Sequence, residues 1–220
     1  MTTEITLSQL LCSRLCHDLV GAAGAINAGI ELLNEDSSDM SAPLNLMETS
    51  ANQVTQRLSF FRVAFGSAGG PDSPVDAATL QKLISGYLSD KKVVVVWSAL
   101  NFDGATKESV SATGKLLCLM MLIASDCMPR GGDVAVHVAP LDEGIGIALE
   151  GMGTAVRLPE TIHLALNASE IDEHITARNV HAYFANQLAV GAGGSLEVEC
   201  DETTVQIACV LSSGGDRHQP

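Results

Sequence analysis

Apolar residues recur at steps of three and four along residues 10–33, at Leu11, Leu15, Leu19, Ala22, Ile26, Ile30 and Leu33. On an α-helix this spacing forms one stripe about 100° wide. The pattern predicts a helix that begins near Thr6 or Ser8 and ends near Glu35. Because His17 falls nearly opposite the centre of the stripe, a helix that buries the stripe holds this histidine towards solvent.

A second apolar stripe follows in residues 43–65, formed by Leu44, Met47, Ala51, Val54, Leu58, Phe61 and Phe65. An acidic turn at residues 34–39 joins the two helices, which predicts an antiparallel hairpin. Val20, Phe60 and Val63 leave apolar edges beside the stripes. These edges predict a twofold dimer in which two hairpins form a four-helix bundle. Alternatively, the edges pack on the rest of the same chain.

A segment rich in glycine and proline divides the chain. We expect a helical hairpin domain at residues 1–66, a linker at 67–75, a second domain at 76–212 and a disordered tail at 213–220. The second domain is expected to contain a central strand at 92–98, because that run is apolar on both faces.

The remaining elements of the second domain follow from the same periodicities. Helices are expected at 76–88, 113–128, 160–166 and 172–190, and further strands at 133–139, 146–150, 154–158, 195–200 and 204–211. The fold class is therefore α+β, an N-terminal antiparallel helical hairpin followed by an α/β sandwich with two or three helices on one face of a mixed sheet.

Composition restricts the partners and the compartment. The 220-residue chain is 46% hydrophobic and carries a formal net charge of −14, which repels nucleic acids and anionic membranes. The N-terminus lacks the basic region of a signal peptide, and the longest strongly apolar run, Leu116 to Ala124, is too short to span a bilayer. We expect a cytoplasmic protein whose six cysteines, none in a C-x-x-C pair, stay reduced.

The candidate chemistry lies around His17. Gly21 and Gly24 share its side of the helix, although each glycine costs a helix roughly 1 kcal/mol relative to alanine. They leave open space beside an exposed imidazole, which indicates a binding surface for another molecule. The alternative is an ordinary surface histidine with glycines that serve helix packing. The histidines at 137, 163, 174 and 181 lack ligand partners at metal-binding spacing and are expected to be structural or solvated.

The segment CSRLCHDLVGAAGAINAGIELL, with His17-Asp18-Leu19 at its core, resembles the phosphoacceptor helix of the alphaproteobacterial ChpT-type histidine phosphotransferases. It resembles more loosely the dimerisation helix of sensor histidine kinases. Residues 57–66, RLSFFRVAFG, are similar to the end of the second hairpin helix of the ChpT-type proteins. The match departs at Ala22, where both families commonly carry a proline, so the usual kink is not expected.

The order of elements in the second domain resembles the ATP-binding half of a histidine kinase. The long helix lacks the asparagine that such kinases use for Mg²⁺, and Asp142 to Gly146 mimics the adenine-binding motif where a hairpin turn belongs. Residues 190–194 follow the last helix and so favour a helix stop over a phosphate-binding lid. We therefore expect a degenerate relative without ATP, cofactor, autokinase activity or ATPase activity.

The resemblance implies a phosphorelay protein. His17 would take a phosphoryl group from the aspartate of a hybrid-kinase receiver domain and pass it to a response-regulator receiver, with Mg²⁺ held by the receiver. Gly21 and Gly24 would leave room for docking. Arg14 could attract the phosphate or be an exposed, solvated residue, and Asp18 could orient the ring or make packing or capping contacts. Two other functions remain, a dimeric scaffold or anti-regulator without phosphotransfer and an active sensor-kinase core.

Overall fold

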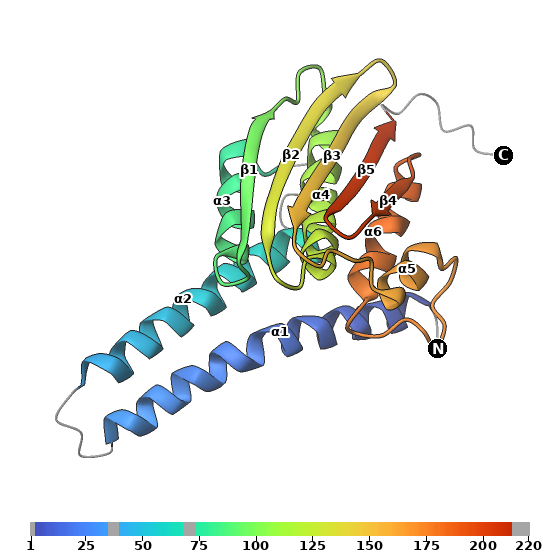
Figure 1. Cartoon of the computed structure of the whole chain (residues 1–220). Coiled ribbons are helices and arrows are strands. Elements are labelled where there is room, and N and C mark those ends of the chain that lie inside the picture. The colour runs from blue at the N-terminus through green and yellow to red at the C-terminus, as the bar shows by residue number, and fades with distance from the viewer. Residues whose placement is uncertain (1–2, 35–39, 68–73, 213–220) are drawn as a thin grey trace.

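The computed structural model describes residues 3–34, 40–67 and 74–212. A helical hairpin carries a sheet domain on one end, and the loop end of the hairpin projects away from that domain (Figure 1). The elements are α1 (Thr3–Asn34), α2 (Ser41–Ala64), α3 (Ala77–Leu88), β1 (Val93–Leu100), α4 (Lys107–Cys127), β2 (Gly132–Leu141), β3 (Gly144–Gly153), α5 (Glu160–Asn167), α6 (Val180–Gly191), β4 (Leu196–Cys200) and β5 (Thr204–Ser212). The predicted fold class, a helical hairpin followed by an α/β domain, is confirmed.

The sheet has the strand order β1-β2-β3-β5-β4. Only the pair β1–β2 is parallel, and the other pairs are antiparallel. The strand predicted to be central, β1, is therefore an edge strand, so that prediction is wrong. Val94 and Val96 are 60% and 54% exposed on the open face of the sheet. A run of valines reflects the β-propensity of branched side chains, which does not require that both faces be covered.

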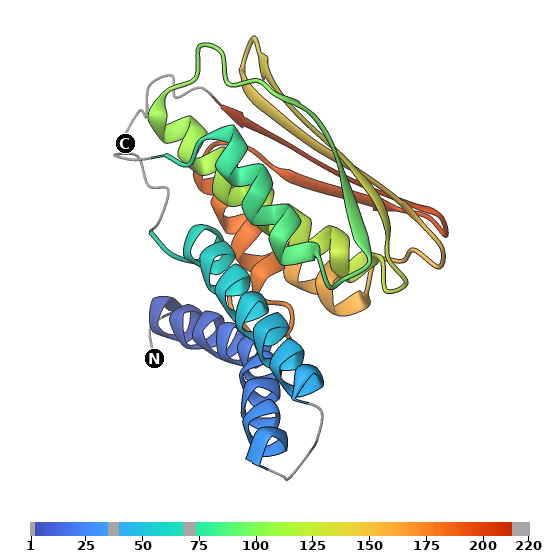
Figure 2. The ribbon, with the colours of Figure 1, turned by 90° about the vertical axis from the view of Figure 1, so that its left-hand side faces the viewer.

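Helices α3, α4 and α6 lie on one face of the sheet, as Figure 2 shows for α3 and α4. The middle helix, α4, is apolar on all sides because other elements surround it, and residues 116–124 are fully buried. By length and composition α4 could cross a membrane, but 72% of its most apolar window is buried in this chain. We therefore assign α4 as the core helix of the domain.

Two predicted elements of the second domain are wrong. Residues 154–158 form no strand, because β3 alone runs on to Gly153 and the chain then turns away. The helix predicted at 172–190 begins only at Val180. The buried Asn179 side chain accepts from the backbone N–H of Thr176 at 2.7 Å and donates to the carbonyl of Thr161 at 2.8 Å. These bonds hold the preceding loop against α5 in a non-helical path.

The predicted turns and helix ends agree better with the structure. Residues 142–143 form the turn between β2 and β3, as expected for the Asp142 to Gly146 segment. Gly193 has a positive φ of 75°, and Gly194 donates to the carbonyl of Ala189 at 2.9 Å, which ends α6. The tail at 213–220 and most of the predicted linker at 67–75 lie outside the described residues.

The end of α2 enters the core of the second domain. Phe60 is fully buried, and its ring stacks on that of Tyr87 from α3 with centroids 4.1 Å apart. Val63 is also buried. The interpretation that Phe60 and Val63 face a second hairpin is therefore wrong, and both pack on their own chain. Val20, by contrast, is 67% exposed.

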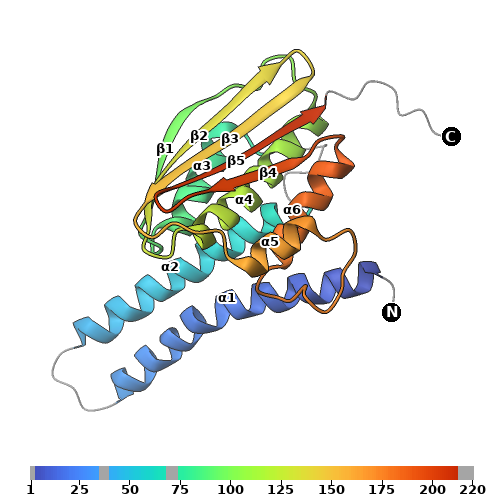
Figure 3. The same ribbon diagram turned by 45° about the vertical axis from the view of Figure 1, so that its right-hand side comes forward.

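The first half of α1 passes beside α6, and its packing against the second domain positions the site (Figure 3). Leu7, Leu10, Leu11 and Leu15 of α1 pack against the core of the domain. This half of the apolar stripe is thus covered within the chain. His17 lies where α1 leaves the domain and continues into the projecting part of the hairpin.

Candidate functional site

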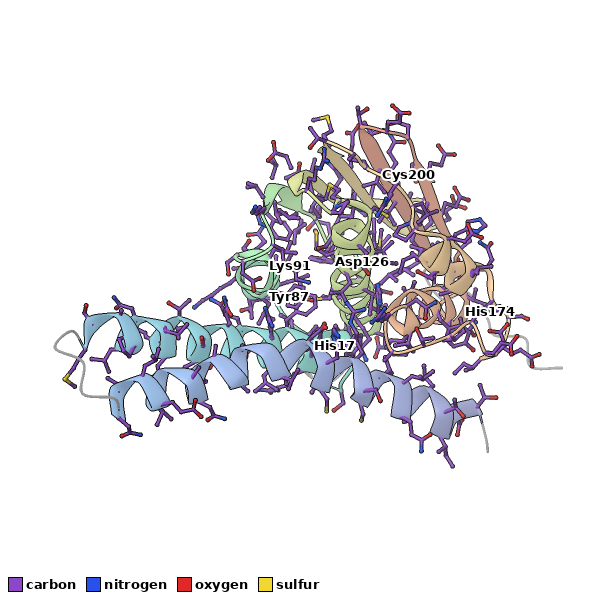
Figure 4. The ribbon with its side chains drawn as sticks, turned by 60° about the horizontal axis from the view of Figure 1, so that its bottom comes forward. His17, Tyr87, Lys91, Asp126, His174 and Cys200 are labelled. Carbon is purple, nitrogen blue, oxygen red and sulfur yellow. The ribbon has the colours of Figure 1, made fainter. Side chains whose placement is uncertain are left out.

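His17 is exposed on α1, with 69% of its side chain accessible to solvent. Figure 4 shows it on the helix beneath Asp126, Tyr87 and Lys91 of the second domain. A Cβ atom added at Gly21 or Gly24 would meet nothing within 4 Å. The prediction of an exposed imidazole beside open space is therefore confirmed.

Asp18 holds the ring of His17. Its Oδ1 atom lies 3.1 Å from Nδ1 of His17, while Oδ2 accepts from Nε of Arg14 at 3.0 Å. An ionised carboxylate only accepts hydrogen bonds, so this contact assigns the proton of a neutral His17 to Nδ1. The Nε2 atom then keeps its lone pair. Of the two roles considered for Asp18, the geometry favours orientation of the ring.

Arg14 is buried, so its expected exposure is wrong. Its Nη1 atom donates to the carbonyl of Arg178 at 2.5 Å and lies 3.4 Å from Nδ1 of His181. Burial alone would lower the pKa of the Arg14 guanidinium, but the carboxylates of Asp18 and Asp126 raise it above its usual value. Arg14 is therefore a permanent cation that links α1 to the second domain.

His181 and Asp126 lie behind Arg14. The fully buried His181 presents Nε2 to Oδ2 of Asp126 at 3.1 Å. Burial lowers the pKa of His181, so the ring is neutral at neutral pH. Burial alone would raise the pKa of Asp126, but His181, Arg14 and Lys91 hold it below its usual value. Asp126 is thus a carboxylate that faces Nε2 of His181 as a charge at 3.1 Å, without a well-aligned hydrogen bond between the two groups.

Arg57 supports the same turn of α1 from the other side. It donates to the main-chain carbonyl of Asp18 and pairs with Oδ2 of Asp90 at 2.5 Å. Next to it, Lys91 donates to the Tyr87 hydroxyl at 2.8 Å, and burial lowers the pKa of that lysine. Charged and polar groups from α1, α2, α3, α4 and α6 therefore surround Asp18.

A cavity of about 420 Å³ opens beside His17. Both domains contribute to its wall, which is formed by Arg14, His17, Asp18, Asp126, Pro159, Thr161, Ile162 and Arg178. Arg178 is exposed and contributes a cation to the wall of the cavity that His17 also lines. Within the described ranges, no group of three His, Cys, Asp or Glu residues is arranged to hold a metal ion. The six cysteines are free.

The sequence did not indicate Asp126, His181 or Arg57 as parts of the site. His174, which the predicted helix at 172–190 would have carried together with His181, lies in a turn before α6 begins. One available signal was the position of His181 within a run of apolar and small residues, because a polar side chain on a buried face requires a partner.

An exposed helical imidazole, oriented by a carboxylate on a hairpin beside an α/β domain, is the arrangement of a phosphotransfer protein of two-component signalling. Comparison with known proteins gives the particular family. Residues 77–204, more than half of the chain, match the family described as histidine phosphotransferase C-terminal domain.

A curated protein and a solved phosphotransferase structure agree with that match. The chain is 33% identical over 196 residues to the protein phosphotransferase ChpT of Brucella abortus (strain 2308), covering 89% of this chain and 91% of the relative. It is also similar to a bacterial phosphotransferase solved at 1.7 Å, with a TM-score of 0.79, 29% identity and coverage of 95% and 98%. The histidine kinase domain of the blue-light activated kinase EL346 of Erythrobacter litoralis aligns with a TM-score of 0.49 and 14% identity, over 90% of this chain and 95% of that one. The chain belongs to the ChpT-type histidine phosphotransferase family.

Proposed function

We propose that His17 is the phosphoacceptor of this phosphotransferase. It receives a phosphoryl group from the aspartate of a hybrid-kinase receiver domain and passes it to the aspartate of a response regulator. The observation that carries the proposal is the contact of Asp18 with Nδ1 of His17, which leaves Nε2 free on an exposed ring. Family membership supports phosphotransfer as the activity.

In this mechanism Nε2 of His17 attacks the phosphorus of the aspartyl phosphate. The N–P bond forms as the P–O bond to the aspartate breaks, and the receiver recovers its free carboxylate. Positive charge develops on the imidazole during the attack, and the negative charge of Asp18 at 3.1 Å stabilises it. The reverse steps transfer the group to the second receiver. Mg²⁺ and its carboxylate ligands belong to the receiver. The bound Mg²⁺ neutralises negative charge on the phosphoryl group.

The receiver domain docks over the open part of α1. Gly21 and Gly24 leave room for it, and the cavity beside His17 accommodates the phosphoryl group near Arg178. The second domain contributes this wall without using ATP, because the segment that mimics a nucleotide motif serves as the turn between β2 and β3. The protein acts in the cytoplasm, where receiver domains and their kinases transfer phosphate.

A homodimer covers the projecting half of the hairpin. Large apolar side chains are exposed along α1 and α2, namely Val20, Ile30, Leu32, Leu44, Leu46 and Leu58, the last of them near the second domain. Exposed apolar patches of this kind mark interaction surfaces, and a twofold partner hairpin presents the same residues in return.

The test mixes a phosphate-labelled receiver domain of a hybrid kinase with the wild type, with His17→Gln and with His163→Gln. His163 is an exposed helical histidine on α5 and serves as the matched control. We expect acid-labile label on the wild type and on His163→Gln, and none on His17→Gln. Label on His17→Gln would refute the assignment of the acceptor. Transfer to no variant from any receiver of the same source would favour a scaffold, and label from ATP alone would indicate a kinase.

A further inference from the structure

We propose that His181 and Asp126 are positioning residues for phosphotransfer, which act on His17 through Arg14 and Asp18. This inference rests on the proposed function of His17. It assigns the second domain a role beyond docking, because His181 lies on α6 and Asp126 on α4.

The contacts form one uninterrupted series. Oδ2 of Asp126 lies 3.1 Å from Nε2 of His181, and Nδ1 of the same ring lies 3.4 Å from Nη1 of Arg14. Nε of Arg14 lies 3.0 Å from Oδ2 of Asp18, whose Oδ1 lies 3.1 Å from Nδ1 of His17. The series joins residues from three helices, and it ends at the exposed ring.

The donor and acceptor roles fit only one arrangement. Arg14 has only donors, so Nδ1 of His181 must be its acceptor and the proton of that neutral ring sits on Nε2, towards Asp126. The negative charge of Asp126, 3.1 Å from Nε2, favours the same tautomer of His181. With His181 and the Arg178 carbonyl as acceptors, the planar guanidinium of Arg14 is held so that its Nε donates to Asp18. One oxygen of Asp18 is thereby occupied, and the other is directed to His17.

Burial limits the access of water to the inner contacts of this series, which join His181, Arg14 and Asp18. His181 is fully buried, Arg14 is 8% exposed, and the Asp18 side chain is 15% exposed. Well-packed apolar residues at such an interface would often be at least as stabilising as buried charges. The polar series is therefore best explained by the orientation that it imposes on Asp18.

Loss of the acceptor at His181 would release Arg14 to turn towards Asp126 or the cavity. Asp18 would then be free to rotate, and the Nδ1–H tautomer of His17 would lose its preference over the Nε2–H tautomer. A ring that carries its proton on Nε2 has no lone pair there for the phosphoryl group.

The test compares two substitutions in the full-length chain. His181→Leu fills the site without an acceptor, whereas His181→Asn places an amide oxygen near the position of Nδ1. Long-range ¹⁵N–¹H NMR of the imidazoles reports the tautomer of His17, and transfer from the labelled receiver reports the rate. His163→Leu is the control for loss of a histidine, and circular dichroism checks the fold of each variant.

We expect His181→Leu to shift His17 towards a mixture of tautomers and to slow transfer by about tenfold to a hundredfold, the range found for supporting partners of metal-ligating histidines. His181→Asn should retain the Nδ1–H tautomer and most of the rate. Slow transfer with an unchanged tautomer, or equal defects in both variants, would overturn the inference. If His17→Gln itself transferred phosphate, the proposed function would fail instead, so the two failures are distinguishable.

Discussion

Nη1 of Arg14 lies 3.4 Å from Nδ1 of His181, although 167 residues separate the two in the sequence. The helix that carries His17 is therefore tied to the second domain through buried polar groups as well as through apolar packing. Four further predictions concern this contact between Arg14 and His181, the glycines of α1 and the helical hairpin.

The buried contact between Arg14 and His181 makes the stability of the fold sensitive to mild acid. Burial lowers the pKa of His181 in the folded protein, and the groups that face the ring are Asp126 and Arg14. Below pH of about 6.5 the unfolded chain binds a proton at this histidine that the folded chain does not bind. The stabilising contribution is complete above that pH and is lost as the pH falls towards the folded pKa.

His181→Asn removes this titration. We expect the free energy of unfolding of the wild type to fall between pH 7 and pH 5.5 by more than that of the variant, with a difference in slope of at most about 1.4 kcal/mol per pH unit. Urea denaturation at both pH values measures the difference. All other residues are the same in the two proteins, so their contributions to the slope cancel. Parallel slopes would contradict the assignment of a neutral, buried His181.

The same substitution should change the stability of the protein in opposite directions at two glycines of α1. Gly24→Ala adds a methyl group to open space and should stabilise the protein by up to about 1 kcal/mol. Gly29→Ala should destabilise it, because a Cβ there would overlap Cγ of Met47 and lie 3.2 Å from the carbonyl of Pro43. Thermal unfolding of both variants provides the comparison, and stabilisation of Gly29→Ala would contradict the close packing of α1 on α2.

A larger side chain at position 24 tests docking of the receiver domain separately from stability. Gly24→Leu should remain folded but should slow phosphotransfer, since the added side chain occupies the space beside His17 that a receiver domain requires. An unchanged rate for Gly24→Leu would place the docking surface elsewhere.

The helical hairpin should dimerise through its exposed apolar residues. Leu44 and Leu58 are 49% and 41% exposed on α2, so Leu44→Glu and Leu58→Glu should yield folded monomers. Met152 is 57% exposed on the open face of the sheet, and Met152→Glu is the matched control that should stay dimeric. Sedimentation equilibrium distinguishes the two states. A monomeric wild type, or dimers of both hairpin variants, would refute the dimer surface.

The sequence by itself determined the features that depend on local periodicity. Steps of three and four predicted α1 and α2, the exposure of His17 and the open helix face at Gly21 and Gly24. Capping chemistry was also local, since the Asp76 side chain accepts from the backbone N–H of Thr79 at 2.9 Å at the start of α3. These features follow from backbone geometry and from neighbours within one or two helical turns.

Tertiary structure decided which faces are covered and which polar groups meet. Valines on both faces of β1 did not reveal that it lies at a sheet edge, and Phe60 could have been covered by a second hairpin as readily as by Tyr87. Arg14 became a buried cation only because α6 packs against α1 and brings His181 to it. Periodicity along one element fixes which side chains share a face, but the partner of that face comes from a distant part of the chain, and only the folded structure identifies it.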